Sequence, residues 1–199
     1  VDEVVVVDYG MGNLLSVQRG LEYCGASVTV SADHKVILEA SKVVLPGVGA
    51  FIDGMNEAGM HAVGKHFPGH GGIHEDSHVA QVEDFRSMEA LEKHDLLPFS
   101  ALKNKLGGIM TAHISFPKID INIATFSKFW LSEILRNAIY FQGIIFSDDL
   151  SMKGADLGGS ISKKIEQAFD AGCNIILICN DRSAAIEALH FMEENAYVS

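Results

Sequence analysis

The chain has 199 residues, a formal net charge of −11 at pH 7 and a hydrophobic content of 48%, which is enough apolar material for a substantial core. This acidic balance argues against nucleic acid or an anionic membrane as a partner, because both carry negative charge. Every apolar run is far shorter than the roughly 20 residues that a membrane-spanning helix needs. The N-terminal VDEVVVVDYG has no basic leader or cleavage site, so we expect a strand there and a cytoplasmic protein.

Short β-branched apolar runs alternate with amphipathic stretches along the chain. The expected strands are Glu3–Asp8, Ser27–Ser31, Lys42–Pro46, Ala62–His66, Gly108–His113, Gly143–Asp148 and Asn174–Cys179. The expected helices are Asn13–Cys24, Lys35–Ala40, Phe51–Ala58, Ser87–Lys103, Lys128–Asn137, Ser160–Ala171 and Ala184–Glu194. Nearly continuous hydrophobicity, as in VVVV and NIILI, is typical of parallel strands covered on both faces. The pattern predicts an α/β fold with about seven βα units in one mostly parallel sheet.

Two strings carry most of the reactive side chains: KHFPGHGGIHEDSH at residues 65–78 and GIIFSDDL at residues 143–150. Each follows or ends an expected strand, and α/β folds collect their chemistry at the C-terminal ends of parallel strands. A carboxylate at one strand end, with a histidine and a second carboxylate on another loop, fits a nucleophile and a general acid/base. The strings therefore predict an active site shared by two strand ends.

The histidines of the first string recur every fourth residue, at positions 66, 70, 74 and 78, which on a helix would form a metal-binding face. Pro68 and three glycines favour a loop instead, so we expect no metal and no cofactor. His113, at the end of IMTAHI, either lines a pocket or is a hydrogen-bonded structural histidine. The three cysteines, Cys24, Cys173 and Cys179, have no C-x-x-C spacing, and a disulfide framework is not expected.

The strings VVVVDYGMGNLLSVQRGLEYCGA (4–26) and KVVLPGVGAF (42–51) resemble the glutaminase subunit of imidazole glycerol phosphate synthase, a class I glutamine amidotransferase. The resemblance implies a flavodoxin-like βαβαβ fragment over residues 1–50, with an oxyanion-type turn at Gly47, Val48 and Gly49. That family also needs a cysteine in a G-x-C-x-G elbow, and this chain has none. We therefore expect the turn to be vestigial and glutaminase activity to be absent.

The strings FIDGMNEAGM, GKHFPGHGG, EDSH, IMTAHI, GIIFSDDLSM and DAGCNIILICN resemble the second half of family 3 glycoside hydrolases, and specifically the β-N-acetylglucosaminidases of peptidoglycan recycling. The resemblance implies half of a (βα)8 barrel over residues 51–199 and a retaining mechanism. A retaining glycosidase needs a carboxylate nucleophile and a separate proton donor. The implied nucleophile is Asp148, the implied general acid/base is His78 oriented by Asp76, and the implied sugar contacts are Lys65 and His66.

The two resemblances meet near residues 49–51 without a linker, which suggests an engineered fold chimera forming a single domain over residues 1–199. We expect an open, doubly wound, flavodoxin-like sheet with the strand order 2-1-3-4-5-6-7. The alternative is a TIM-like barrel, incomplete or completed by dimerisation, so that the protein is a monomer or a homodimer.

The strings that supply sugar contacts in the first half of the glycosidase barrel do not occur in this chain. We therefore expect weak binding of an N-acetylglucosamine-containing sugar and no significant catalysis. The alternative function is a retaining β-N-acetylglucosaminidase with a rebuilt site.

Overall fold

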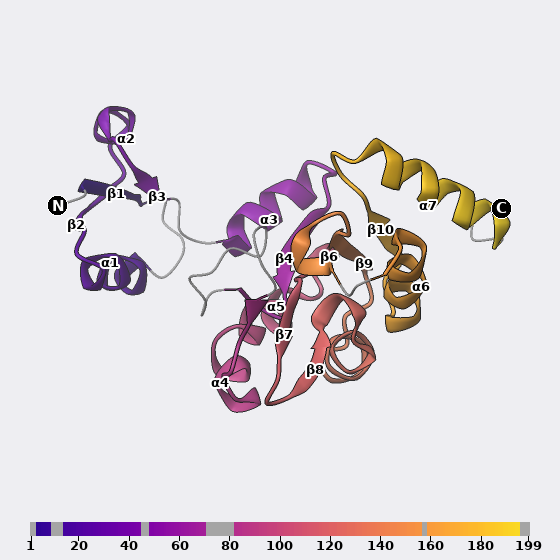
Figure 1. Cartoon of the computed structure of the whole chain (residues 1–199). Coiled ribbons are helices and arrows are strands. Elements are labelled where there is room, and N and C mark those ends of the chain that lie inside the picture. The colour runs from indigo at the N-terminus through magenta and orange to yellow at the C-terminus, as the bar shows by residue number, and fades with distance from the viewer. Residues whose placement is uncertain (1–2, 9–13, 45–47, 71–81, 157–158, 196–199) are drawn as a thin grey trace. The chain divides into compact units, whose positions relative to one another are not determined.

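A computed structural model describes residues 3–8, 14–44, 48–70, 82–156 and 159–195. The chain divides into two compact units, Val1–Met60 and His61–Ser199, and each has its own parallel sheet (Figure 1). The boundary between the two units falls after Met60, whereas the boundary between the two sequence resemblances falls at residues 50–51.

The N-terminal unit has a three-stranded parallel sheet in the order β2-β1-β3. Its elements are β1 (Glu3–Val7), α1 (Leu14–Tyr23), β2 (Ser27–Ser31), α2 (His34–Glu39), β3 (Val43–Val44) and α3 (Val48–Glu57). Val4 and Val6 are buried, as expected for side chains that alternate along a strand with one covered face. Asp33 starts α2 by accepting a hydrogen bond from the backbone N–H of Lys35 at 2.8 Å.

The C-terminal unit contains a four-stranded parallel sheet in the order β10-β9-β6-β4. These strands are β4 (Ala62–Phe67), β6 (Leu106–Thr111), β9 (Ile144–Asp149) and β10 (Ile175–Leu177). The four strands therefore lie side by side in the same order in which they follow one another along the chain. This is the arrangement of strands in a barrel segment.

The predicted single sheet of order 2-1-3-4-5-6-7 is not confirmed in the part of the chain that the structure describes. All seven predicted strands form, but three lie in the sheet of the first unit and four in that of the second. Hydrophobic periodicity identifies a strand without identifying its partner, because a helical crossover can lead to the same sheet or to a new one. The coarser prediction of an α/β fold with mostly parallel strands is confirmed.

A second, smaller sheet of the C-terminal unit was not predicted. It consists of β5 (Val82–Glu83), β7 (Ile114–Phe116) and β8 (Asp120–Ile123) in the order β5-β7-β8, with the last pair antiparallel. The segment that connects β6 to η2 passes through β7, β8 and the 3-10 turn η1 (Ala124–Phe126). This excursion brings Thr125 of η1 to 2.8 Å from Thr111, the last residue of β6.

The helices of the C-terminal unit are α4 (Met88–Lys93), α5 (Leu96–Leu102), the π-helix η2 (Phe129–Ala138), the 3-10 turn η3 (Lys153–Ala155), α6 (Ile161–Ala171) and α7 (Arg182–Glu194). The predicted helix Ser87–Lys103 is divided into α4 and α5. Pro98 explains the division, because a proline fits the first turn of α5 but would break the interior of one long helix. Within the described residues, no helix is both long and apolar enough to cross a membrane.

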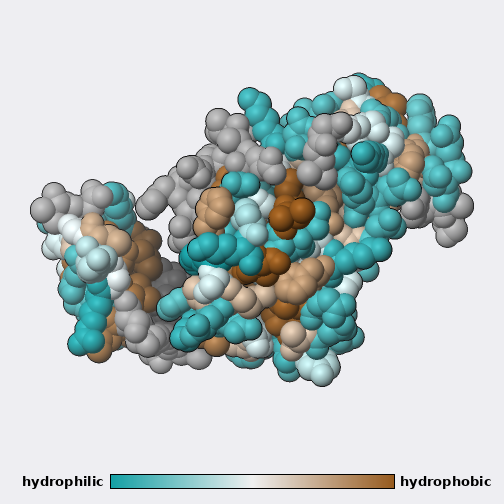
Figure 2. All heavy atoms as spheres, turned by 60° about the horizontal axis from the view of Figure 1, so that its bottom comes forward, coloured by the Kyte–Doolittle hydropathy of each residue, from teal (hydrophilic) through white to brown (hydrophobic). Residues whose placement is uncertain are grey.

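Aromatic side chains form the core beneath the C-terminal end of β4. The Phe67 ring lies 5.3 Å from Phe99 and 6.3 Å from Trp130, and Trp130 lies 5.0 Å from Phe116. Phe67, Phe116 and Trp130 are fully buried, and each contributes about 1.5–3 kcal/mol or more through removal from water. Figure 2 shows other apolar atoms at the surface, interspersed with hydrophilic ones. The packed rings of Phe67, Phe99, Phe116 and Trp130 support the end of β4, which carries Lys65 and His66.

Candidate active site

The C-terminal ends of β4, β6 and β9 meet at one edge of the sheet because the three strands are parallel. His66 lies on β4 and Asp148 on β9, and β6 separates the two strands. The Nε2 atom of His66 is nevertheless 3.8 Å from Oδ2 of Asp148. The two side chains keep 32% and 17% of their surface exposed, so a ligand can reach both. The structure therefore brings together two of the side chains that the resemblance implies.

A hollow of about 460 Å³ adjoins His66 at this edge. Its lining consists of Lys65, His66, Gly69, His70, Asp95, Pro98 and Phe99. The lining combines cationic or neutral donors with a carboxylate and an aromatic ring, which suits a ligand with several hydroxyl groups and one apolar face.

Asp148 and Asp149 are adjacent on β9 but have different surroundings. Oδ1 of Asp148 accepts the backbone N–H of Asp149 at 2.8 Å. Oδ1 of Asp149 accepts three hydrogen bonds, from the backbone N–H groups of Ser151 and Cys179 at 2.9 Å and from the Ser151 hydroxyl at 2.8 Å. Asp149 therefore holds the loops after β9 and β10 in place, whereas Oδ2 of Asp148 lies opposite His66.

His113 is buried, with 1% of its surface exposed, and both of its ring nitrogens have partners. Nε2 lies 2.9 Å from the carbonyl oxygen of Asp149, and Nδ1 lies 2.9 Å from the hydroxyl of Thr125. Burial lowers the pKa of His113 below the ordinary histidine value, although the nearby Asp148 and Asp149 act in the opposite direction. Of the two roles left open for His113, the structure favours the hydrogen-bonded structural histidine.

An ion cluster that sequence reasoning missed fixes the chain next to the hollow. The Arg86 guanidinium lies between two carboxylates, with Nη2 2.6 Å from Oδ2 of Asp84 and Nη1 2.7 Å from Oδ2 of Asp95. Hydrogen bonds to Asp84 and Asp95 raise the pKa of Arg86, so its charge is permanent. Gly69 packs against Asp95: a Cβ at Gly69 would lie 2.4 Å from the Asp95 Cβ. The cluster thus links α5 to the end of β4.

Several predicted site residues lie outside the described residues. These are the implied general acid/base His78, its partner Asp76, and Gly47 of the oxyanion-type turn. Val48 and Gly49 form the first turn of α3. No group of three or more metal-binding side chains occurs among the residues that the structure describes.

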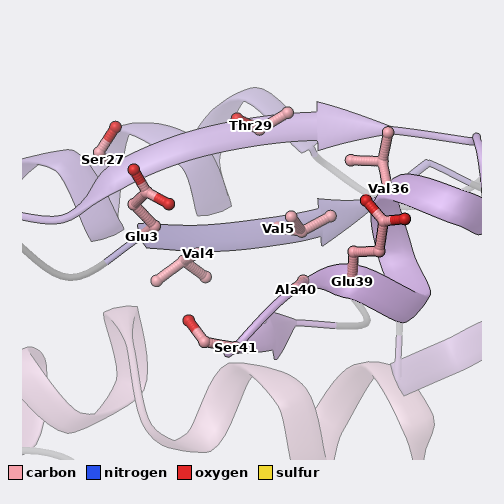
Figure 3. Close-up of a pocket in the computed structure, with 9 residues that line it drawn as sticks. All are labelled: Glu3, Val4, Val5, Ser27, Thr29, Val36, Glu39, Ala40 and Ser41. Atoms are coloured by element: carbon pink, nitrogen blue, oxygen red, sulfur yellow. The ribbon is translucent and has the colours of Figure 1, made fainter.

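The N-terminal unit has a pocket of its own, of about 400 Å³ (Figure 3). Glu3 of β1 and Glu39 of α2 supply carboxylates, and Ser27, Thr29 and Ser41 supply hydroxyl groups. The rest of the lining is Val4, Val5, Val36 and Ala40, so the pocket lacks a basic group or histidine that could act with the carboxylates. Neither Glu3 nor Glu39 lies in a string that carries the glycosidase resemblance, and the strand-end site of the C-terminal unit is the better candidate.

Comparison with known proteins identifies the family. The family model for the N-terminal domain of glycosyl hydrolase family 3 matches residues 36–198, which is more than half of the chain. The chain belongs to this family. The family 3 assignment confirms the glycosidase resemblance of the sequence strings.

Family 3 relatives agree with the assignment. A beta-hexosaminidase of Idiomarina loihiensis is 53% identical over 140 residues, covering 70% of this chain and 42% of the relative. A beta-hexosaminidase of Tolumonas auensis is 43% identical over 185 residues, covering 92% of this chain and 53% of the relative. The chain thus spans about half the length of these relatives, or less.

The fold is shared with solved family 3 structures. NagZ from Neisseria gonorrhoeae, in complex with N-trifluoroacetyl-D-glucosamine, matches with a TM-score of 0.65 and 41% identity, covering 73% of this chain and 41% of NagZ. This likeness supports an α/β fold with mostly parallel strands of the family 3 type, which is consistent with the TIM-like alternative.

The hypothesis of a glutaminase chimera gains no support from these comparisons. The family 3 match begins at residue 36, and the Tolumonas auensis relative aligns over 92% of the chain, so both extend into the segment assigned to a glutaminase fragment. The glutaminase-like interpretation of residues 1–50 stays a prediction.

Proposed function

We propose that the chain carries the nucleophile side of a retaining β-N-acetylglucosaminidase site and binds N-acetylglucosamine-containing glycans. One observation carries the proposal: Asp148 and His66 meet at 3.8 Å where three parallel strands end, beside a hollow of about 460 Å³. The relatives named above are beta-hexosaminidases, and one solved relative holds a glucosamine derivative. Because the chain spans only part of these relatives, the activity itself belongs to the proposal.

The proposed roles follow the chemistry of retention. An Asp148 carboxylate oxygen forms a bond to the anomeric carbon while the glycosidic bond breaks and the leaving oxygen takes a proton from His78. Water then attacks the anomeric carbon, transfers a proton to His78 and releases Asp148. Lys65 and His66 hold sugar hydroxyls, and Asp76 orients His78. Asp149 is not assigned the nucleophile role in this proposal, because its Oδ1 atom already accepts three hydrogen bonds that hold the neighbouring loops.

A chromogenic β-N-acetylglucosaminide tests the proposal. We expect Asp148→Asn to lower kcat/KM by at least about a thousandfold, because the nucleophile acts only in the chemical step. The matched control is Asp170→Asn, which makes the same change at an exposed position of α6 and should leave kcat/KM unchanged.

Binding is measured separately, by titrating N-acetylglucosamine and following the NMR signals of the histidine rings. We expect a shift at His66 in both the wild type and Asp148→Asn. Turnover that is insensitive to Asp148→Asn, or a titration that leaves the His66 signal unmoved, would contradict the proposal.

A further inference from the structure

A closed circuit of buried hydrogen bonds surrounds the backbone of Asp148 and Asp149. The N–H of Asp148 donates to the Thr111 hydroxyl at 3.3 Å, and the Thr111 and Thr125 hydroxyl oxygens are 2.8 Å apart. Thr125 in turn lies 2.9 Å from Nδ1 of His113, whose Nε2 is 2.9 Å from the carbonyl oxygen of Asp149. Thr111 and Thr125 are fully buried and His113 is nearly so, which keeps water from replacing any member of the circuit.

The direction of each hydrogen bond follows from the donors available. A carbonyl oxygen can only accept, so Nε2 of His113 must carry a proton toward Asp149. In the neutral ring Nδ1 is then an acceptor, and the Thr125 hydroxyl donates to it rather than to the Ala112 carbonyl oxygen 3.1 Å away. Thr125 accepts from the Thr111 hydroxyl, and Thr111 accepts from the Asp148 N–H. Every donor in the circuit therefore has one acceptor.

The neutral ring is also the form that the surroundings favour. Burial opposes the imidazolium, and the Lys164 ammonium acts in the same direction, while Asp148 and Asp149 favour the charged form. Burial is the largest of these effects. The opposite neutral tautomer would leave the bare Nε2 lone pair 2.9 Å from a carbonyl oxygen, where the two repel.

We propose that His113 is a positioning residue: as the neutral Nε2–H tautomer it grips the Asp149 carbonyl directly and the Asp148 N–H through Thr125 and Thr111, and so fixes the direction of the Asp148 side chain. This role rests on the proposed function of Asp148, but it is measurable in the absence of turnover. Asp148 sits at the end of β9, where the strand gives way to a loop, and backbone fixed on both sides of its carboxylate cannot rotate away from His66.

Histidine ring 15N NMR on the full chain tests the tautomer. We expect His113 to show a protonated Nε2 and a bare Nδ1. Its ring signals should not change as the pH falls from about 8 to about 6.5, the ordinary histidine pKa. A protonated Nδ1 with a bare Nε2, or an ordinary titration midpoint, would overturn the proposal. No variant is needed for this measurement.

Hydrogen exchange of the Asp148 amide tests the positioning. Thr125→Val removes the hydroxyl at nearly constant shape, and we expect the Asp148 amide to exchange about five- to tenfold faster. The matched control is Ser115→Ala, because among the described atoms the buried Ser115 hydroxyl has no hydrogen-bond partner. Unchanged exchange in Thr125→Val, or equal acceleration in Ser115→Ala, would show that the circuit does not hold Asp148.

A third comparison separates this inference from the proposed function. His113→Gln keeps an N–H that can reach the Asp149 carbonyl, whereas His113→Phe removes it. We expect His113→Gln to retain slow Asp148 exchange better than His113→Phe, and any turnover to fall through kcat with KM unchanged. An inactive wild type with the expected tautomer and exchange rates would contradict only the proposed function. Activity with equal exchange in both variants would contradict only the role of His113.

Discussion

Replacing Arg86 with methionine should destabilise the C-terminal unit more than any exposed charge change. The guanidinium makes five hydrogen bonds of 2.6–3.1 Å to Asp84 and Asp95, whose side chains are only 4% and 8% exposed. Methionine has a similar length but leaves both buried carboxylates without their cation. Breaking a buried ion pair from one side costs about 3–5 kcal/mol. Because Arg86 itself is 29% exposed, water offsets part of the loss, and we expect about 3 kcal/mol.

Urea denaturation followed by circular dichroism measures this loss. With a slope of about 2 kcal/mol per molar urea, a loss of about 3 kcal/mol lowers the unfolding midpoint by about 1.5 M. The control is Lys93→Met, which breaks the 2.7 Å pair with Glu89 at side chains that are 65% and 75% exposed. That exposed pair is worth only about 0.3–0.5 kcal/mol. A midpoint for Arg86→Met within the range of the Lys93→Met control would refute the reasoning.

Three further predictions concern pH, backbone shape and thiol reactivity. Because burial lowers the pKa of His113 in the folded state, the unfolded chain binds the proton first as pH falls below about 6.5, and stability drops by up to about 1.4 kcal/mol per pH unit. His113→Gln should flatten that part of the urea-midpoint profile, and an identical profile would contradict it. Gly69→Ala should lower the melting temperature and reduce the free energy of unfolding by about 2 kcal/mol or more. Gly69 has φ +147°, and its new Cβ would meet the Asp95 Cβ at 2.4 Å. A melting curve unchanged from the wild type would speak against this packing. Burial raises the pKa of the Cys173 thiol to about 12, so mass spectrometry after brief alkylation should find Cys173 unmodified until urea is added, and early modification there would be the contrary result.

The long strands could be predicted from sequence because their hydrophobic runs are continuous. The predicted strand Gly143–Asp148 and the observed β9 (Ile144–Asp149) differ by one residue at each end. The short strands could not be predicted in this way, since β5 (Val82–Glu83) and β7 (Ile114–Phe116) have too few residues for a periodic signal. Their pairing joins Val82 to Ile114, far along the chain, and only the folded structure brings them together.

The side chains at the strand ends could be anticipated, but those that support them could not. Placing His66 and Asp148 at one edge requires only that β4 and β9 be parallel, which their composition indicates. Thr125 lies in a 3-10 turn after the unpredicted strands, so no local pattern relates it to His113. The string DFR at residues 84–86 is typical of an ordinary charged surface. The position of the Arg86 guanidinium between Asp84 and Asp95 depends on tertiary packing. Thr111 and His113 lie two residues apart in the expected strand Gly108–His113, and residues two apart on an extended strand share a face. This spacing was the sequence signal that could have linked Thr111 to His113.

Within the described residues, the contacts of Asp148 come from the C-terminal unit, and they separate two parts of the proposed function: placing Asp148 and orienting a sugar. Thr111 holds its backbone, and His66 and the Asp149 amide face its carboxylate. Among the described residues, this placement of Asp148 involves the ends of β4, β6 and β9 with the turn η1. Orienting a sugar is a different task that needs groups around the whole ring, and such positioning can account for about 7–11 kcal/mol of a reaction barrier. Chain segments that add sugar contacts should therefore change affinity and turnover of the site while leaving the 15N and exchange signatures at His113 and Asp148 unchanged.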